Sequence, residues 1–142
     1  MHLMTRPTKA SDIKREWHLI DAKDKVLGRE ATGIAKLLMG KGKAYFAKNL
    51  DCGDFVVVVN AQEVQVTGKK ETDKVYTRYS GYPGGLRKIT VKELREQKPE
   101  EIIRHAVSGM LPKNKLRASM LKRLYVFSGS EHPYGSNIKN QI

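Results

Sequence analysis

The feature that most constrains the fold is a run of apolar residues, Phe55-Val56-Val57-Val58-Val59. No polar residue alternates with them, and the four valines are β-branched. A strand that is apolar at every position is typical of one covered on both faces, usually in a parallel sheet between helices. The run therefore predicts a buried central strand.

Helical and strand patterns alternate around this run. Residues 17–21 predict a short strand, and residues 21–25 a polar turn. Apolar residues at 31, 34, 35 and 38 form one helical stripe, so we expect a helix over residues 29–39 that Gly40 ends. Further expected elements are one helical turn at 60–63, strands at 64–67, 74–79 and 124–127, and helices at 91–97, from 99 onward and at 115–123.

Two helix starts are marked by their residue types. Thr90 is a candidate N-cap with Glu93 three residues later, and Pro99 suits the first position of the next helix. The predicted buried face of that second helix is Ile102, Ile103, Ala106, Val107 and Met110. Strands that alternate with helices imply an α/β fold with a mainly parallel sheet.

The length of 142 residues suits a single domain spanning 1–142. We expect a polar N-terminal arm over about residues 1–15 and a polar C-terminal tail over about residues 130–142 without regular structure, because Pro133 interrupts it. Trp17 is expected to anchor the core. The single cysteine, Cys52, excludes an intramolecular disulfide, and no signal peptide or membrane span is recognised, so we predict a cytoplasmic protein.

Positive charge is concentrated in segments that lack acids. The chain holds 27 Lys and Arg against 15 Asp and Glu, a net charge of +12. Residues 102–130 contain no acid and six Lys or Arg, and residues 74–92 contain no acid and five. A glycine-rich loop at 81–85 contains Tyr82 and follows Tyr79, and both tyrosines suit stacking on unpaired bases. Together these segments favour nucleic-acid binding.

Two other functions remain as alternatives. An enzyme acting on nucleotides or RNA would use the doubly covered strand and the glycine loop, but the loop matches no nucleotide fingerprint. Asp51 and Asp54 flank Cys52, and we interpret them as acids of a turn rather than as an acid–base pair. A peripheral membrane protein is a weaker alternative. The histidines are not spaced as metal ligands, so we predict no metal, no cofactor and no catalytic residue.

Several motifs in order resemble a known family. These are Trp17, Asp21-Ala22 and Leu27-Gly28-Arg29 near the start, Asp51-Cys52-Gly53-Asp54 before the apolar strand, Thr67-Gly68-Lys69-Lys70, Gly84-Gly85, and above all Ala106-Val107-Ser108-Gly109-Met110-Leu111-Pro112-Lys113-Asn114. The chain is similar to large-subunit ribosomal protein thirteen of the bacterial type from about Trp17 to His132.

The resemblance implies a three-layer α/β/α domain around a small, mainly parallel sheet. It implies a structural constituent of the large ribosomal subunit, not an enzyme, that binds large-subunit ribosomal RNA and supports subunit assembly beside neighbouring ribosomal proteins. Some family members also repress translation by binding their own messenger RNA. Our predicted RNA-binding residues are Lys41, Lys43, Lys48, Lys69, Lys70, Lys74, Arg78, Tyr79, Gly84, Gly85, Arg87, Lys88, Lys113, Lys115, Arg117, Lys122, Arg123 and His132.

Two variants are predicted to differ in their effects on folding and on RNA binding. Lys113→Glu/Lys115→Glu/Arg117→Glu is expected to leave the fold intact and to weaken RNA binding. Gly109→Val is expected to impair folding.

Overall fold

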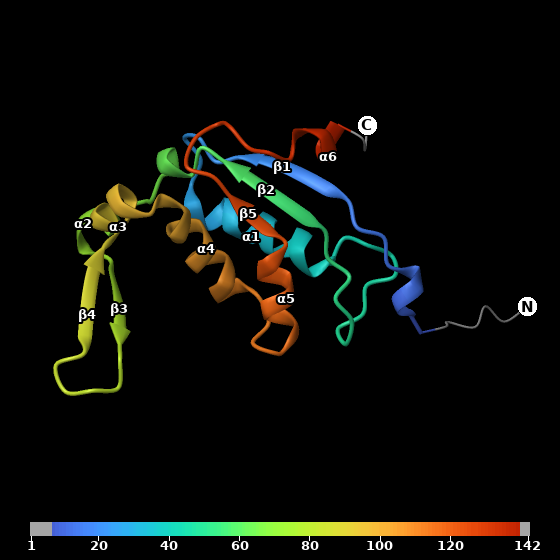
Figure 1. The fold of residues 1–142 in the computed structure, drawn as a ribbon, viewed down its shortest axis with the longest axis horizontal. Helices are drawn as coiled ribbons and strands as arrows, with labels where there is room; N and C mark the ends of the chain where they lie inside the picture. The colour runs from blue at the N-terminus through green and yellow to red at the C-terminus, as the bar shows by residue number, and fades with distance from the viewer. Residues whose placement is uncertain (1–6, 140–142) are drawn as a thin grey trace, which may run out of the picture.

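The computed structural model describes residues 7–139, and its centre is a parallel three-stranded sheet (Figure 1). The strands β1 (Trp17–Asp21), β2 (Phe55–Val59) and β5 (Leu124–Val126) lie in the order β1-β2-β5. Val56 to Val59 are all buried in the central strand. The predicted α/β fold with a mainly parallel sheet is therefore confirmed, and the apolar run is its middle strand.

One face of the sheet packs against the long helices α1 (Leu27–Met39) and α4 (Pro99–Met110). Side chains alternate along β2, so Val56 and Val58 face these helices and Val57 faces the other side. The core between the layers holds Ile34 and Leu38 of α1 with Ile103 and Val107 of α4. Helix α5 (Leu116–Lys122) leads from this layer into β5.

The third layer of the predicted α/β/α arrangement is thin. The other face of the sheet carries the short helix α6 (Gly135–Lys139), which lies over β1 on the side away from α1 (Figure 1). Trp17 is half-buried there, stacked on Phe55 with ring centroids 4.4 Å apart and on Tyr134 at 5.3 Å. Trp17 thus anchors this outer aromatic cluster and not the main core. The prediction of no regular structure after residue 130 is wrong at α6.

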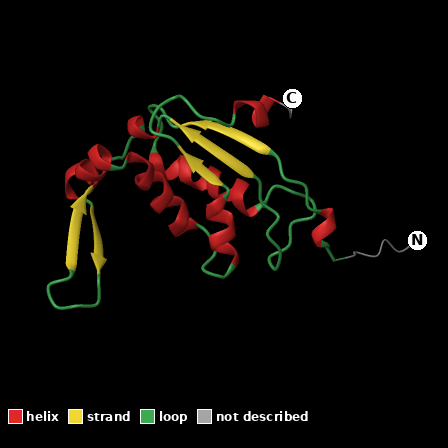
Figure 2. Ribbon diagram, viewed as in Figure 1, coloured by secondary structure: helices red, strands yellow, loops and turns green. Residues whose placement is uncertain are grey.

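A second unit extends from the body between β2 and α4. It consists of α2 (Lys70–Asp73), the antiparallel hairpin of β3 (Val75–Tyr79) and β4 (Leu86–Thr90), and α3 (Val91–Gln97). The two strands stand away from the body as a long arm (Figure 2). Thr90 caps α3 by accepting a hydrogen bond from the amide of Glu93, as predicted. Arg95 of α3 fastens this unit through both carboxylate oxygens of Glu71 and the carbonyls of Gln62 and Val64.

Several predicted boundaries need correction. β4 was not predicted, and residues 64–67 form no strand but one isolated bridge between Gln65 and Val26. The helical turn near residue 60 is the 3-10 helix η2 (Ala61–Glu63). Met110, predicted to be buried in α4, is 42% exposed. The helix over residues 29–39 begins two residues earlier, and Gly40 ends it in the left-handed conformation, with φ 79°.

The described part of the N-terminal arm, from residue 7, packs against the loop before β2. It contains the 3-10 helix η1 (Ala10–Asp12). The Thr8 hydroxyl donates to the carbonyl of Tyr45, and the Arg15 guanidinium donates to the carbonyls of Gly53 and Asp51. The rest of the predicted arm and the last residues of the predicted tail lie outside the described residues. None of the helices within residues 7–139 combines the length and the hydropathy that crossing a membrane requires.

Candidate nucleic-acid interface

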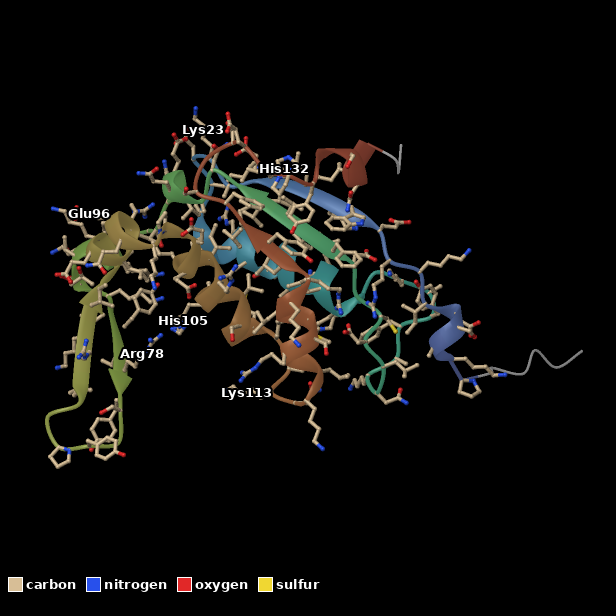
Figure 3. The ribbon with its side chains drawn as sticks, viewed as in Figure 1. Lys23, Arg78, Glu96, His105, Lys113 and His132 are labelled. Carbon is tan, nitrogen blue, oxygen red and sulfur yellow. The ribbon has the colours of Figure 1, made fainter. Side chains whose placement is uncertain are left out.

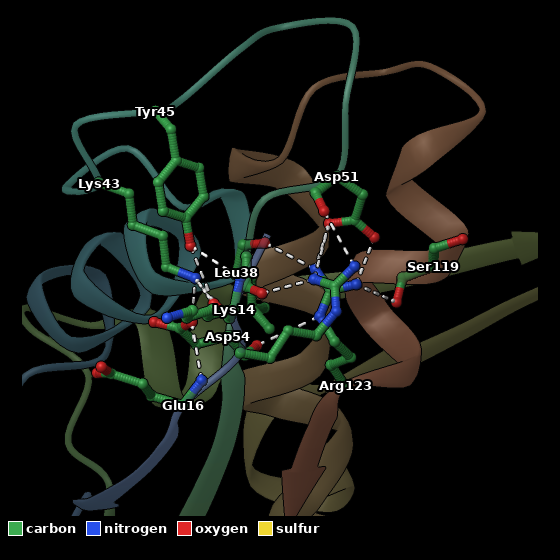
Figure 4. A network of polar contacts seen from close by, with 11 residues as sticks. Lys14, Glu16, Leu38, Lys43, Tyr45, Asp51, Asp54, Ser119 and Arg123 are labelled. Atoms are coloured by element: carbon green, nitrogen blue, oxygen red, sulfur yellow. Dashed lines mark hydrogen bonds and ion pairs between the residues drawn. The ribbon is translucent and has the colours of Figure 1, made fainter. Parts of the chain in front are cut away.

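The predicted contact Arg123 is a structural residue. Its side chain is buried and donates to both carboxylate oxygens of Asp51, to the carbonyl of Leu38 at 2.9 Å, and to the carbonyls of Asp54 and Ser119 (Figure 4). A guanidinium with its donors directed at five oxygens inside the protein has none aimed at a ligand. We therefore remove Arg123 from the RNA-binding prediction.

Lys43 is also held inside the protein. Its ammonium forms an ion pair with Asp54 and donates to the carbonyl of Lys14 (Figure 4). Burial by itself raises the pKa of Asp54, but hydrogen bonds from Lys43, His18 and the Glu16 amide outweigh it, so that this pKa lies below its ordinary value. Asp51 and Asp54 are thus partners of internal cations, and Asp54 also accepts from the backbone amide of Glu16.

Glu16, His18 and Asp54 bring three ligand atoms within 4.8 Å of one another. The Asp54 carboxylate of this cluster is already neutralised, because it is paired with the ammonium of Lys43. The cluster is therefore a junction that joins the arm, β1 and the loop before β2.

The hairpin presents cations that form no ion pair with an acid among residues 7–139. Arg78 of β3 lies directly opposite Arg87 of β4, and Lys88 lies opposite Thr77. Like charges opposite one another destabilise a strand pair, so this arrangement suits a surface that meets anions. Tyr79 is 64% exposed at the end of β3, and Tyr82 in the tip is 74% exposed. Within residues 7–139 none of these arginines and lysines has an acidic partner.

Two glycines shape the tip of the hairpin. Gly84 has φ 76°, which favours glycine. At Gly85 an added Cβ would lie 1.9 Å from the hydroxyl oxygen of Ser80. The predicted roles of Gly84 and Gly85 in RNA binding remain predictions, and the structure gives both glycines a role in closing the turn.

The loop between α4 and α5 presents a second group of cations. Pro112 follows the end of α4, and the Asn114 side chain accepts a hydrogen bond from the amide of Leu116, which starts α5. Lys113 and Lys115 are exposed, as is Lys122 in α5. Arg117 is half-buried.

The remaining predicted residues lie in three places. Lys41 and Lys48 are exposed on the loop before β2. Lys69 and Lys70 at the start of α2 and Lys74 directly after this helix are exposed as well. His132 is half-buried on the outer face of the sheet, where its Nδ1 accepts from the amide of Tyr134. Figure 3 shows His132 on the opposite side of the molecule from Arg78 and Lys113, so the structure does not bring it together with them.

The cationic loops share one side of the molecule. In Figure 1 the hairpin, the loop between α4 and α5 and the loop before β2 all extend away from α6. Sequence reasoning missed three residues beside them: Arg29, Tyr76 and His105. Burial raises the pKa of the Tyr76 hydroxyl, and its ring lies 4.8 Å from that of His105. Arg29 belongs to one of the sequence motifs, but nothing in the sequence groups the three residues, because they come from three separate elements.

A small α/β body with a projecting basic hairpin and further exposed lysines on its loops is characteristic of the class of proteins that bind polyanions such as nucleic acids. Residues 15–133 match the family described as ribosomal protein L13, and the chain belongs to this family. Ribosomal proteins of this family are structural components and not enzymes, which confirms the prediction.

Curated relatives are similar over most of both chains. A protein of Pelobacter propionicus named large ribosomal subunit protein uL13 is 51% identical over 132 residues, covering 93% of each chain. The protein of that name from Dehalococcoides mccartyi is 53% identical over 132 residues, 93% of this chain and 92% of its own. The protein of that name from Caldanaerobacter subterraneus subsp. tengcongensis is 56% identical over 126 residues, which cover 89% of this chain and 88% of its own.

Proposed function

We propose that this chain is a constituent of the large ribosomal subunit that binds large-subunit ribosomal RNA and supports assembly of that subunit. The relatives are named as large-subunit proteins, and this chain is similar to them over nearly their whole length. The observation that supports RNA as the ligand is the shared orientation of the cationic loops. Their exposed Lys and Arg side chains have no acidic partner within residues 7–139.

The proposed RNA surface consists of the hairpin, the loop between α4 and α5 with Arg117 and Lys122, and the exposed lysines at 41, 48, 69, 70 and 74. Lysine and arginine would neutralise phosphates, and the exposed Tyr79 would stack on an unpaired base. Arg123, Lys43 and His132 are left out because each is engaged within the protein. The same surface would carry any binding to the protein's own messenger RNA, and adjoining ribosomal proteins would contact the parts that RNA leaves free.

The triple variant Lys113→Glu/Lys115→Glu/Arg117→Glu tests this surface. The matched control is Lys23→Glu/Lys25→Glu/Lys98→Glu, which reverses three exposed lysines outside it. Binding to a transcript of large-subunit ribosomal RNA is measured at several salt concentrations for each purified protein. Because log affinity falls by roughly 0.7–0.9 per unit of log salt for each phosphate contact, the triple variant should lose about two to three from the slope.

Circular dichroism and thermal unfolding show whether each variant is folded. A folded triple variant that binds with the same affinity and salt slope as the control would disprove the proposed surface. Sedimentation of a cell lysate through a sucrose gradient tests location. The protein should migrate with the large subunit at low salt and leave it only at high salt, and its appearance in the top fractions alone would contradict the ribosomal role.

A further inference from the structure

A cleft of about 700 Å³ lies where the hairpin unit meets the body. Its walls are the first turn of α1, the second half of α4, residues 66–70 and the base of β3. Pockets for small ligands and single bases fall in this size range. Three of the sequence motifs contribute to these walls, but they lie far apart in the chain, and only the fold brings them together.

The charge of the cleft is of one sign. Arg29 from α1, Lys70 from α2 and Lys74 from the base of β3 line it, and none of its lining residues is acidic. None of the three has an ion-pair partner within residues 7–139. Three cations from three elements in one concave site attract an anion, because the walls focus their combined field.

The other walls are aromatic and apolar. The Tyr76 ring lies 4.8 Å from the His105 ring at an interplanar angle of 55°, and the Lys74 ammonium lies 5.4 Å from the Tyr76 ring centre. Met110 also lines the cleft, and its side chain is 42% exposed although it belongs to an amphipathic helix. These surfaces suit a flat ring, because thioether and aromatic groups both pack well against π-systems.

We propose that the cleft holds one unpaired nucleotide of an RNA strand, with its base against Tyr76, His105 and Met110 and its phosphates near the cations Arg29, Lys70 and Lys74. A nucleotide combines the two properties that the walls select, a flat ring and a phosphate. This inference rests on the proposed function. Figure 3 supports an RNA strand as the source, since Arg78, His105 and Lys113 lie on the same side of the molecule. A strand on the proposed surface therefore passes the opening.

The test follows the backbone amides of Gly28 and Gly109, two cleft residues, by NMR of the full chain. The probes are the single-stranded tetranucleotide r(AAAA), adenosine monophosphate, a 12-base-pair RNA duplex and hexaglutamate. We expect r(AAAA) to shift both amides at concentrations at least tenfold below those needed for the mononucleotide. The duplex and the acidic peptide should leave them unshifted, because neither supplies an unpaired base.

Lys70→Gln/Lys74→Gln should weaken the binding of r(AAAA) about tenfold, since two phosphate contacts are lost. The matched control Lys23→Gln/Lys98→Gln removes the same charge from exposed sites outside the cleft and should change it less than about twofold. Equal shifts with hexaglutamate or with the mononucleotide overturn the assignment to an RNA strand. Equal weakening by the two variants overturns the assignment to the cleft.

The same samples are titrated with the large-subunit ribosomal RNA transcript used above. If the transcript binds but r(AAAA) leaves Gly28 and Gly109 unshifted, the cleft assignment is wrong and the proposed function stands. If the transcript does not bind either, both are wrong.

Discussion

Arg123 joins three parts of the chain that are distant in sequence: the end of α1, the loop before β2, and α5. Removing its side chain would leave the Asp51 carboxylate with the more distant Arg15 guanidinium, 3.8 Å away, and several backbone carbonyls without this donor. Breaking a buried ion pair on one side costs about 3–5 kcal/mol. We therefore expect Arg123→Ala to lower the free energy of unfolding by about that amount, measured by urea unfolding.

The neighbouring Lys122→Ala is the matched control, since it removes the same charge from an exposed side chain. Its expected effect on stability is within about 0.5 kcal/mol. RNA affinity should show the opposite order at temperatures where both variants are folded, with Lys122→Ala the weaker binder. Similar stability of the two variants would contradict the structural role of Arg123.

Gly53 is the glycine that packing requires. An added Cβ would lie 1.6 Å from the carbonyl oxygen of Leu38 and 2.7 Å from the Arg123 guanidinium, so α1 and β2 would have to separate. We expect Gly53→Ala to destabilise the protein by about 3 kcal/mol or more, measured by thermal and urea unfolding.

Gly109, in contrast to Gly53, has open space around it. The expectation that Gly109→Val impairs folding finds no support in the structure, because nothing lies within 4 Å of an added Cβ there. Gly109 is an exposed helix residue, so Gly109→Ala should stabilise by up to about 1 kcal/mol. A loss of stability in Gly109→Ala as large as in Gly53→Ala would show that a Cβ at Gly109 is as crowded as one at Gly53.

At the scale of the elements, the paired arginines of the hairpin of β3 and β4 are expected to favour RNA binding and to lower the stability of the free protein. Arg78 and Arg87 repel one another across the strands in the free protein. A single reversal, Arg78→Glu or Arg87→Glu, converts the repulsion into attraction and should stabilise the protein by about 0.2–1 kcal/mol. The same change should weaken binding to ribosomal RNA, because a phosphate contact becomes a repulsion.

The double reversal Arg78→Glu/Arg87→Glu restores a like-charge pair and serves as the control. Its thermal stability should return to that of the unchanged protein, while its RNA affinity falls below that of either single variant. Equal stabilisation by the double variant would mean that the two side chains do not interact.

The junction of the arm, β1 and the loop before β2 depends on Asp54. Its pKa is depressed below the ordinary 3.8, so its stabilising contribution is complete above that pH and is lost as the pH falls through the lower folded value. We expect Asp54→Asn to be less stable than the unchanged protein at pH 7. The difference in urea unfolding should shrink as the pH falls below about 3.8. A difference that persists unchanged to pH 2.5 would contradict this.

Elements with a local signal were predictable from the sequence. The run Phe55–Val59, the apolar stripe of α1 and the Thr90 cap each depend on residues close in sequence. β4 has no buried face that would produce an alternating pattern, and it exists because β3 supplies its hydrogen bonds. α6 depends on tertiary contact, since Tyr134 just before it packs on Trp17. A short helix of this kind has little stability of its own.

At the scale of the whole molecule, the sequence predicted which segments are cationic but not which cations are free. The acid-free segment 102–130 contains both Lys113, which is exposed, and Arg123, which is buried against Asp51 from a distant loop. Sequence proximity cannot report such a pairing across 72 positions. For the same reason the cleft at Tyr76 and His105 appears only when α1, α4 and the hairpin unit are assembled.

The net charge of +12 should make salt act in opposite directions on stability and on binding. Self-repulsion among exposed cations destabilises the free protein, and screening relieves it, because the Debye length falls from about 30 Å at 0.01 M to about 8 Å at 0.15 M salt. We therefore expect the melting temperature of the free protein to rise between these salt concentrations, while its affinity for ribosomal RNA falls.

The triple variant at residues 113, 115 and 117 has a net charge of +6, because each reversal removes two positive charges. Its melting temperature should rise less with salt, and so should that of the control triple at residues 23, 25 and 98, which has the same net charge. Only the variant at residues 113, 115 and 117 should show a shallower slope of log RNA affinity against log salt concentration. This contrast separates the two effects: the melting temperature reports the total charge of the molecule, and the binding slope reports where the charge lies. A melting temperature of the free protein that falls as salt rises would mean that attractive ion pairs, such as those of Arg123 and Lys43, outweigh the repulsion among the exposed cations.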